Sequence, residues 1–121
     1  ERNKHIQKLY RILLVELLSI DGVFLNGSFE NRVNSNVNIR IDGVKGEDVV
    51  SMCDQYGVCI SAGSACNEGV ATPSHVLKAI GLTDEEALSS IRITIGHQNT
   101  FEEIEKAAKI IKDVITILRK Y

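Results

Sequence analysis

Two short segments in which apolar and polar residues alternate constrain the fold of this chain more than any other feature of its sequence. Residues 37–41 read Val-Asn-Ile-Arg-Ile, and residues 91–95 read Ile-Arg-Ile-Thr-Ile. Because side chains along a strand point alternately to opposite faces, each segment predicts a half-buried β-strand. The apolar residues share the buried face, while Asn38 and Arg92 lie on the opposite faces of their strands.

Segments with helical spacing of apolar residues surround these strands. Such residues recur from Ile6 to Leu18, which predicts a long amphipathic helix that ends near the turn pair Asp21-Gly22. No Ser, Thr, Asp or Asn cap precedes it, which suggests that it continues a longer helix. Further helices are predicted from Gly46 to Gly57, from Thr72-Pro73 to Ile80, and from a capping box at Thr100 through Leu118.

Short elements account for the rest of the chain. Strands are predicted at Val23–Leu25 and Val58–Ser61, and Thr83 opens a capping box for a short turn. Residues 62–69, Ala-Gly-Ser-Ala-Cys-Asn-Glu-Gly, follow neither the helical nor the strand period and predict a mobile loop. The expected fold class is therefore α+β, with a small mixed or antiparallel sheet covered by helices.

Length and composition limit both the architecture and the partners. With 121 residues, 44% of them hydrophobic and 25% charged, the chain predicts one globular domain over residues 1–121. The net charge of −2 is spread without long blocks, which argues against nucleic acid or a membrane surface as a partner. Three unevenly spaced cysteines favour a reducing compartment, and the cytoplasm is the expected location.

The cysteines differ in their surroundings. Cys53 and Cys59 lie in predicted apolar segments and are expected in the core. Cys66 lies among small and polar residues of the predicted loop, where an accessible thiolate can act as a nucleophile. The alternative is an incidental surface thiol. The spacing Cys-x5-Cys-x6-Cys matches no close-paired metal motif, so no metal site is predicted.

Arg92 has two interpretations on the residue pattern alone. An arginine on the polar face of a strand is commonly just solvated. A guanidinium can also bind a carboxylate through two parallel hydrogen bonds. His5, His75 and His97 have no Cys or Asp partner at a recognisable spacing, so they are interpreted as structural or solvated residues.

Several motifs together resemble one enzyme family. They are residues 60–66, Ile-Ser-Ala-Gly-Ser-Ala-Cys, residues 72–81, Thr-Pro-Ser-His-Val-Leu-Lys-Ala-Ile-Gly, and residues 89–96, Ser-Ser-Ile-Arg-Ile-Thr-Ile-Gly, with Asn26-Gly27-Ser28, Arg32 and Asn36-Val37-Asn38 at matching places. Over nearly its whole length the chain resembles the C-terminal part of cysteine desulfurases of the NifS/IscS type, in the class V aminotransferase family. It departs from the common pattern at His97, where many relatives carry Arg, and at Asn34, where they carry Pro.

The resemblance implies a fold, a reaction and roles for individual residues. The fold is that of the small C-terminal domain of fold type I enzymes that use pyridoxal phosphate. Family members convert L-cysteine to L-alanine while the sulfur moves to an enzyme cysteine as a persulfide, and Cys66 matches that acceptor. Arg92 matches the arginine that binds the substrate carboxylate, and Asn38 is a second expected substrate-binding residue. A homodimer and a sulfur-acceptor protein, which serves iron–sulfur cluster assembly or tRNA thiolation, are the implied partners.

The resemblance also implies that part of the catalytic machinery lies elsewhere. In the family, the cofactor lysine belongs to a His-Lys pair in a large N-terminal domain, and this chain has no such pair. No cofactor-binding residue is therefore expected in residues 1–121, and this domain alone is expected to be inactive. Two other functions stay open: a non-enzymatic interaction or regulatory module of the same fold, and a thiol-redox protein that uses Cys66.

Overall fold

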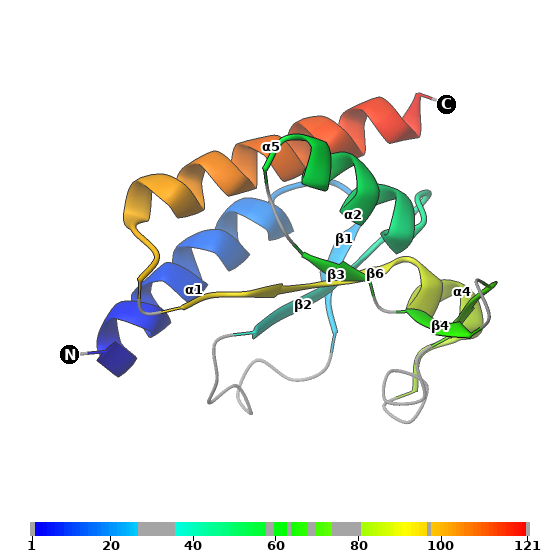
Figure 1. The fold of residues 1–121 in the computed structure, drawn as a ribbon, viewed down its shortest axis with the longest axis horizontal. Coiled ribbons are helices and arrows are strands. Elements are labelled where there is room, and N and C mark those ends of the chain that lie inside the picture. The colour runs from blue at the N-terminus through cyan, green and yellow to red at the C-terminus, as the bar shows by residue number, and fades with distance from the viewer. Residues whose placement is uncertain are drawn as a thin grey trace.

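A computed structural model describes residues 2–26, 36–57, 60–62, 64–67, 70–73, 81–96 and 98–120, with the backbone alone at 2–3, 64–67 and 70–73 (Figure 1). None of the helices among these residues is long and apolar enough to cross a membrane. The elements, in chain order, are α1 (Arg2–Leu18), β1 (Val23–Leu25), β2 (Asn36–Ile41), α2 (Gly46–Gln55), β3 (Ser61–Ala62), β4 (Ser64–Asn67), β5 (Val70–Pro73), α4 (Asp84–Leu88), β6 (Ser90–Thr94) and α5 (Phe101–Arg119).

A four-stranded antiparallel sheet forms the centre of the fold, in the order β1-β2-β6-β3. Its central pair joins β2 to β6, in a register that sets Val37 opposite Ile93 and Asn38 opposite Arg92. β3 pairs with the other edge of β6, where Ser61 lies opposite Arg92. The expected α+β class with an antiparallel sheet is confirmed, and β2 and β6 each have the predicted apolar and polar faces.

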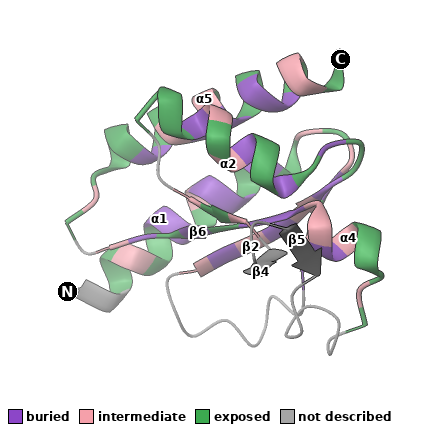
Figure 2. Ribbon diagram, turned by 45° about the vertical axis from the view of Figure 1, so that its right-hand side comes forward, coloured by how far each residue is buried: buried purple, intermediate pink, exposed green. Residues whose placement is uncertain are grey.

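Three helices cover one face of this sheet. In two views α1, α2 and α5 lie on the same side of it, and both α1 and α2 pack against α5 (Figures 1 and 2). Between helices and sheet lies one apolar core, in which Leu13, Leu17, Ile39, Ile91 and Ile111 have no exposed surface. Because burying a side chain of this size contributes roughly 1.5–3 kcal/mol, this face is the main source of the fold's stability.

The end of α5 ties together two turns of the sheet. Arg119 donates from Nη1 to the backbone oxygen of Asp21 (2.6 Å) and from Nε and Nη2 to that of Asp42 (3.1 and 2.9 Å). Gly22 and Gly43 follow these carbonyls with φ of 78° and 86°, a region that favours glycine. A Cβ at Gly22 would lie 2.5 Å from the Arg119 guanidinium. Arg119 therefore joins the end of α5 to the turns before β1 and after β2.

The segment around Cys66 differs from its prediction. Residues 62–69 are predicted as a mobile loop, but β4 and β5 pair antiparallel there, with Cys66 opposite Ala71. The loop prediction is wrong because these strands pair through their backbones, which requires no alternation of apolar residues.

Two neighbouring predictions are affected in the same region. Pro73 ends β5 and does not begin a helix, as an edge strand tolerates a missing N–H. Residues 74–80, where that helix is predicted, lie outside the described residues. Of the strand predicted at Val58–Ser61, residues 58–59 also lie outside the described residues, and β3 begins at Ser61.

The capping box predicted for α5 is present, and its contribution to stability can be measured. Thr100 Oγ1 accepts from the Glu103 N–H (3.1 Å), and Glu103 Oε1 accepts from the Thr100 N–H (2.8 Å). We expect Thr100→Ala to lower the free energy of unfolding by about 1 kcal/mol, because the helix loses its cap. The matched control is Thr116→Ala in the same helix, where the hydroxyl only donates back to the Lys112 carbonyl. Urea unfolding that finds equal losses for both variants would contradict this assignment.

The stability of the fold should depend on pH through the two capping carboxylates, Glu86 and Glu103. Hydrogen bonds from the backbone N–H groups of Thr83 and Thr100 are the main cause that lowers the pKa of Glu86 and Glu103. A carboxyl with a lower pKa in the folded state stabilises the fold above its unfolded pKa, and this contribution disappears as the pH falls through the folded value. We expect the urea concentration at the unfolding midpoint to decrease as the pH is lowered below about 4.3, the ordinary glutamate pKa. The decrease should be smaller in the double variant Glu86→Gln/Glu103→Gln. Parallel acid profiles for the two chains would show that these carboxylates do not contribute.

Candidate substrate-binding face

The polar face of the sheet carries the two predicted substrate-binding residues. Arg92 is exposed and Asn38 is half-buried. Because they lie directly opposite each other in the β2–β6 pair, their side chains leave the sheet on the same side. Ser61 on β3 lies opposite Arg92 at the other edge of β6 and shares this side. The structure therefore brings Asn38 and Arg92 together as neighbours on inner strands.

This pair has the chemistry to bind an anion. A guanidinium has donors only, in a planar fork that matches the two oxygens of a carboxylate. An asparagine amide presents either N–H donors or an acceptor oxygen, depending on which end faces the ligand. The orientation of the Asn38 amide therefore decides whether it assists Arg92 or opposes it.

A buried asparagine, Asn26, is hydrogen-bonded to Asn38. Asn26 follows β1 and has no exposed surface. Its Nδ2 donates to Oδ1 of Asn38 (2.9 Å) and to Oγ of Ser90 (3.0 Å), and its Oδ1 accepts from Nη1 of Arg40 (3.1 Å). Its backbone N–H donates to the Asn38 carbonyl (2.9 Å), so side chain and main chain both join the two asparagines.

Charged and aromatic groups hold Arg40 in place. Its Nε lies 3.4 Å from Oε2 of Glu86, and its guanidinium carbon lies 5.0 Å from the centre of the Phe24 ring. The other oxygen of Glu86 accepts from the Thr83 N–H (2.9 Å), and this hydrogen bond is the first cause that lowers the pKa of Glu86. Glu86 is therefore ionised at neutral pH and pairs with Arg40 while it caps α4.

Sequence reasoning did not find the supporting residues Arg40, Glu86 and Ser90. The motif Asn26-Gly27-Ser28 is the one signal in the sequence, but an asparagine followed by glycine is also typical of a turn. The sequence pattern does not distinguish a buried asparagine from one in a turn, because asparagine is also common in turns, where its side chain bonds to nearby backbone. The contacts of Asn26 depend on strands that are distant in sequence.

Cys66 lies on the polar side of the sheet as far as its backbone is described. The strand β4 and the short helix α4 lie across the sheet from α5, and α4 packs against β5 (Figure 1). The Cys66 side chain is outside the described part of the structure. The position of β4 places the backbone of Cys66 away from the helix-covered core.

The other residues that the sequence analysis singled out either lie elsewhere in the structure or fall outside its described residues. Cys53 is buried as expected, and burial raises the pKa of its thiol to about 11, which makes it an inert core residue. His5 Nε2 lies 2.7 Å from the backbone oxygen of Asn99, a structural contact between the start of α1 and the segment before α5. Outside the described residues lie Arg32, Cys59, His75 and His97.

The strands of the polar face have donors for a carboxylate but no lysine for pyridoxal phosphate. The cofactor needs a lysine for its aldehyde and donors for its phosphate. The strands that form the polar face, β1, β2, β3 and β6, contain no lysine. Within the described ranges, no group of three or more His, Cys, Asp or Glu residues is placed to hold a metal ion.

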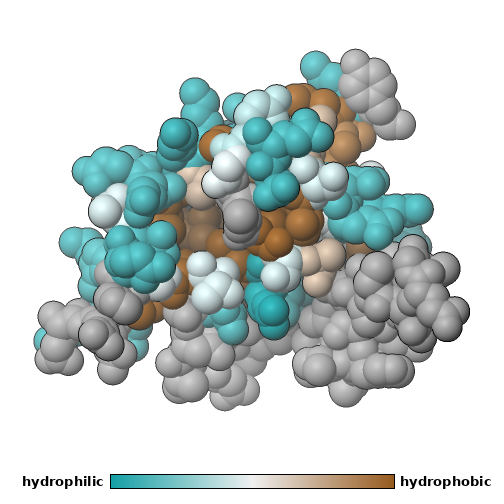
Figure 3. All heavy atoms as spheres, viewed as in Figure 1, coloured by the Kyte–Doolittle hydropathy of each residue, from teal (hydrophilic) through white to brown (hydrophobic). Residues whose placement is uncertain are grey.

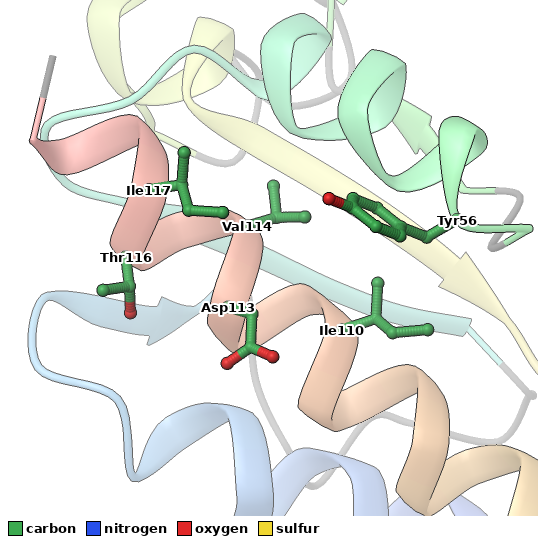
Figure 4. Close-up of a pocket in the computed structure, with 6 residues that line it drawn as sticks. All are labelled: Tyr56, Ile110, Asp113, Val114, Thr116 and Ile117. Carbon is green, nitrogen blue, oxygen red and sulfur yellow. The ribbon is translucent and has the colours of Figure 1, made fainter.

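An apolar hollow lies on the helical side and is separate from this site. It has a volume of about 340 Å³ and lies between Tyr56, at the end of α2, and Ile110, Val114 and Ile117 of α5 (Figure 4). Apolar side chains also gather on the surface seen in Figure 3. The hollow has none of the charged donors of the polar face, so it does not extend the candidate site.

Comparison with known proteins identifies the family. The family model described as Aminotransferase class-V matches residues 1–107. The cysteine desulfurase IscS of Neisseria meningitidis serogroup A is 41% identical over 116 residues, which cover 96% of this chain and 28% of that protein. The IscS of Methylococcus capsulatus is 41% identical over 118 residues, which cover 98% of this chain and 29% of that protein.

Solved structures agree in fold. A NifS-like protein superposes with a TM-score of 0.79 at 24% identity, over 95% of this chain and 28% of its own. The NifS-like protein of Rickettsia africae superposes with a TM-score of 0.75 at 28% identity, over 93% of this chain and 28% of its own. The chain thus spans less than a third of the length of the relatives that it matches. It belongs to the aminotransferase class-V family, and it corresponds to a segment of a cysteine desulfurase of the NifS/IscS type.

Proposed function

We propose that this chain is the C-terminal small domain of a pyridoxal-phosphate-dependent cysteine desulfurase, in which Cys66 accepts sulfur from L-cysteine. The observation that carries the proposal is the pairing of Asn38 with Arg92 on the polar face, on the side of the sheet where β4, which contains Cys66, lies. The relatives, which are named cysteine desulfurases, support the choice of reaction.

In this proposal the polar face binds and orients the substrate. Arg92 binds the carboxylate of L-cysteine through its guanidinium, and Asn38 adds an N–H donor beside it. Both residues lie on inner strands, and a rigid strand backbone positions such groups more precisely than a loop does. The bound carboxylate fixes one end of the substrate and leaves the thiol end toward the acceptor cysteine.

Cys66 is the acceptor of the sulfur atom. The C–S bond of L-cysteine breaks, an S–S bond forms with the Cys66 sulfur, and the substrate carbon takes up a proton. The products are L-alanine and a persulfide on Cys66, so atoms and charge balance without an external oxidant. A thiol at one position of a hairpin is suited to this role, because loops and hairpins present nucleophiles that must reach two partners.

The remaining parts of the enzyme lie outside residues 1–121 in this proposal. The cofactor is bound by a larger domain, so this chain alone is inactive. The enzyme acts in the cytoplasm as a homodimer and passes its sulfur to an acceptor protein for iron–sulfur clusters or tRNA thiolation. The modest net charge of −2 supports a protein acceptor over direct binding to RNA phosphates.

Cys66 provides the direct test of sulfur transfer. In the full-length gene product loaded with pyridoxal phosphate, we expect Cys66→Ser to abolish the persulfide and sulfide release, because serine cannot accept the sulfur. The matched control is Cys53→Ala, whose thiol is buried in the core and is expected to leave persulfide formation intact. Mass spectrometry of the peptide that contains Cys66 should show the gain of one sulfur atom. A persulfide on another cysteine, with Cys66→Ser fully active, would contradict the assignment.

Arg92 provides the test of substrate binding. We expect Arg92→Ala to lower kcat/KM for L-cysteine by about 10- to 100-fold, mainly through KM, since a charged hydrogen bond contributes about 1.5–3 kcal/mol. Arg11→Ala, which removes an exposed arginine from α1, is the control and should leave kcat/KM unchanged. The site is refuted if both variants keep the wild-type value.

A further inference from the structure

Asn26 has a role that neither its motif nor the proposed reaction explains. It is fully buried, and among the described residues its side chain contacts Asn38 and Arg40 of β2 and Ser90 of β6. A buried amide that bonds at both ends can take only one of its two orientations if its partners differ in donor and acceptor character. The partners of Asn26 differ in this way.

Two neighbours determine which end of the Asn26 amide points where. Arg40 can only donate, so the atom that it contacts must be Oδ1 of Asn26. The Ser90 hydroxyl donates to the backbone oxygen of Glu86 (2.8 Å), so its remaining capacity toward Asn26 is that of an acceptor. Both contacts therefore direct Nδ2 of Asn26 toward Ser90 and Asn38.

The orientation of Asn26 then determines that of Asn38. Because Nδ2 of Asn26 can only donate, the Asn38 atom 2.9 Å away must be its oxygen. The nitrogen of the Asn38 amide is the atom that is turned away from Asn26. It belongs to a side chain that shares the polar face with Arg92, its partner across the strand pair. A nitrogen there adds donors for a carboxylate, whereas an oxygen would repel one.

We propose that Asn26 is a positioning residue, which holds the Asn38 amide with its nitrogen toward the substrate carboxylate beside Arg92. This inference rests on the proposed function, because it takes the ligand of the polar face to be a carboxylate. Arg40, which pairs with Glu86, and the Ser90 hydroxyl fix the orientation of the Asn26 amide. The Asn26 amide then fixes the orientation of the Asn38 amide. Asn26 itself touches neither the substrate nor the reacting atoms.

Asn26→Asp replaces the donor that residue 26 presents to Asn38 by an acceptor. An aspartate keeps the size of asparagine and still accepts from Arg40, but it cannot donate to Asn38. The Asn38 amide is expected to turn its nitrogen toward residue 26 and its oxygen toward the ligand. The matched control is Asn99→Asp, the same substitution before α5 and outside the sheet, where an aspartate can still accept from the Gly96 N–H (2.7 Å).

Binding to the full-length protein, loaded with its cofactor, measures the consequence. The probes are L-alanine, which has the carboxylate of the substrate, and ethylamine, which lacks it. We expect Asn26→Asp to raise the Kd of L-alanine about tenfold, as expected for the loss of a hydrogen bond to a charged group, and to leave that of ethylamine unchanged. Asn99→Asp should change neither. A rise for both probes, or an equal rise in the Asn99→Asp variant, would show a merely structural role and overturn the proposal.

A measurement on the wild-type 121-residue chain needs no variant and no activity. In nuclear magnetic resonance spectra, the side-chain amide protons of Asn26 should exchange slowly with water and those of Asn38 quickly, because only the former are donated inside the network. Asn38 protons that exchange as slowly as those of Asn26 would overturn the proposal. If the full-length protein forms no L-alanine from L-cysteine, the proposed reaction fails, and these exchange rates still decide how Asn38 is held.

Discussion

The pairing of β2 with β6 is the constraint on which the rest of the structure depends. Its register sets Val37 against Ile93 on the buried face and Asn38 against Arg92 on the polar face. A slip by one residue would expose the apolar side chains and bury the arginine, so burial of one face specifies the composition of the other. The apolar core therefore positions Asn38 and Arg92 from the opposite face of the sheet.

The polar face is held from several directions at once. Helices α1, α2 and α5 hold the apolar side, and Arg119 joins the end of α5 to the turns beside β1 and β2. On the polar side, Glu86 links the cap of α4 to Arg40, whose guanidinium contacts Asn26. Elements far apart in the sequence thus converge on two side chains of one strand pair, which suits a surface that must present fixed donors.

The strands and helix caps of this fold can be predicted from sequence because their signals are local. Alternation in residues 37–41 predicts β2, and the Thr100 capping box predicts the start of α5. The β4–β5 hairpin was not predicted, since backbone pairing between small residues leaves no period in the side chains. For the same reason the position of the Cys66 backbone follows from the fold and not from its motif.

The support of the candidate site shows a second limit of sequence reasoning. Arg92 can be predicted as a single residue from its chemistry and from the family resemblance, and Asn38 from the resemblance alone. Their neighbours in space cannot be predicted in this way, because Asn26 contacts Asn38 and Ser90, which lie 12 and 64 residues further along the chain. Only tertiary structure shows that this asparagine is buried and hydrogen-bonded to side chains of two strands.

The account depends most on the claim that the polar face of this sheet forms one wall of a substrate site. A crystal structure of the full-length protein with L-alanine bound tests it directly. We predict that the carboxylate of L-alanine lies about 3 Å from guanidinium nitrogens of Arg92 and from Nδ2 of Asn38. A carboxylate bound elsewhere, with Arg92 in contact with solvent only, would contradict the account.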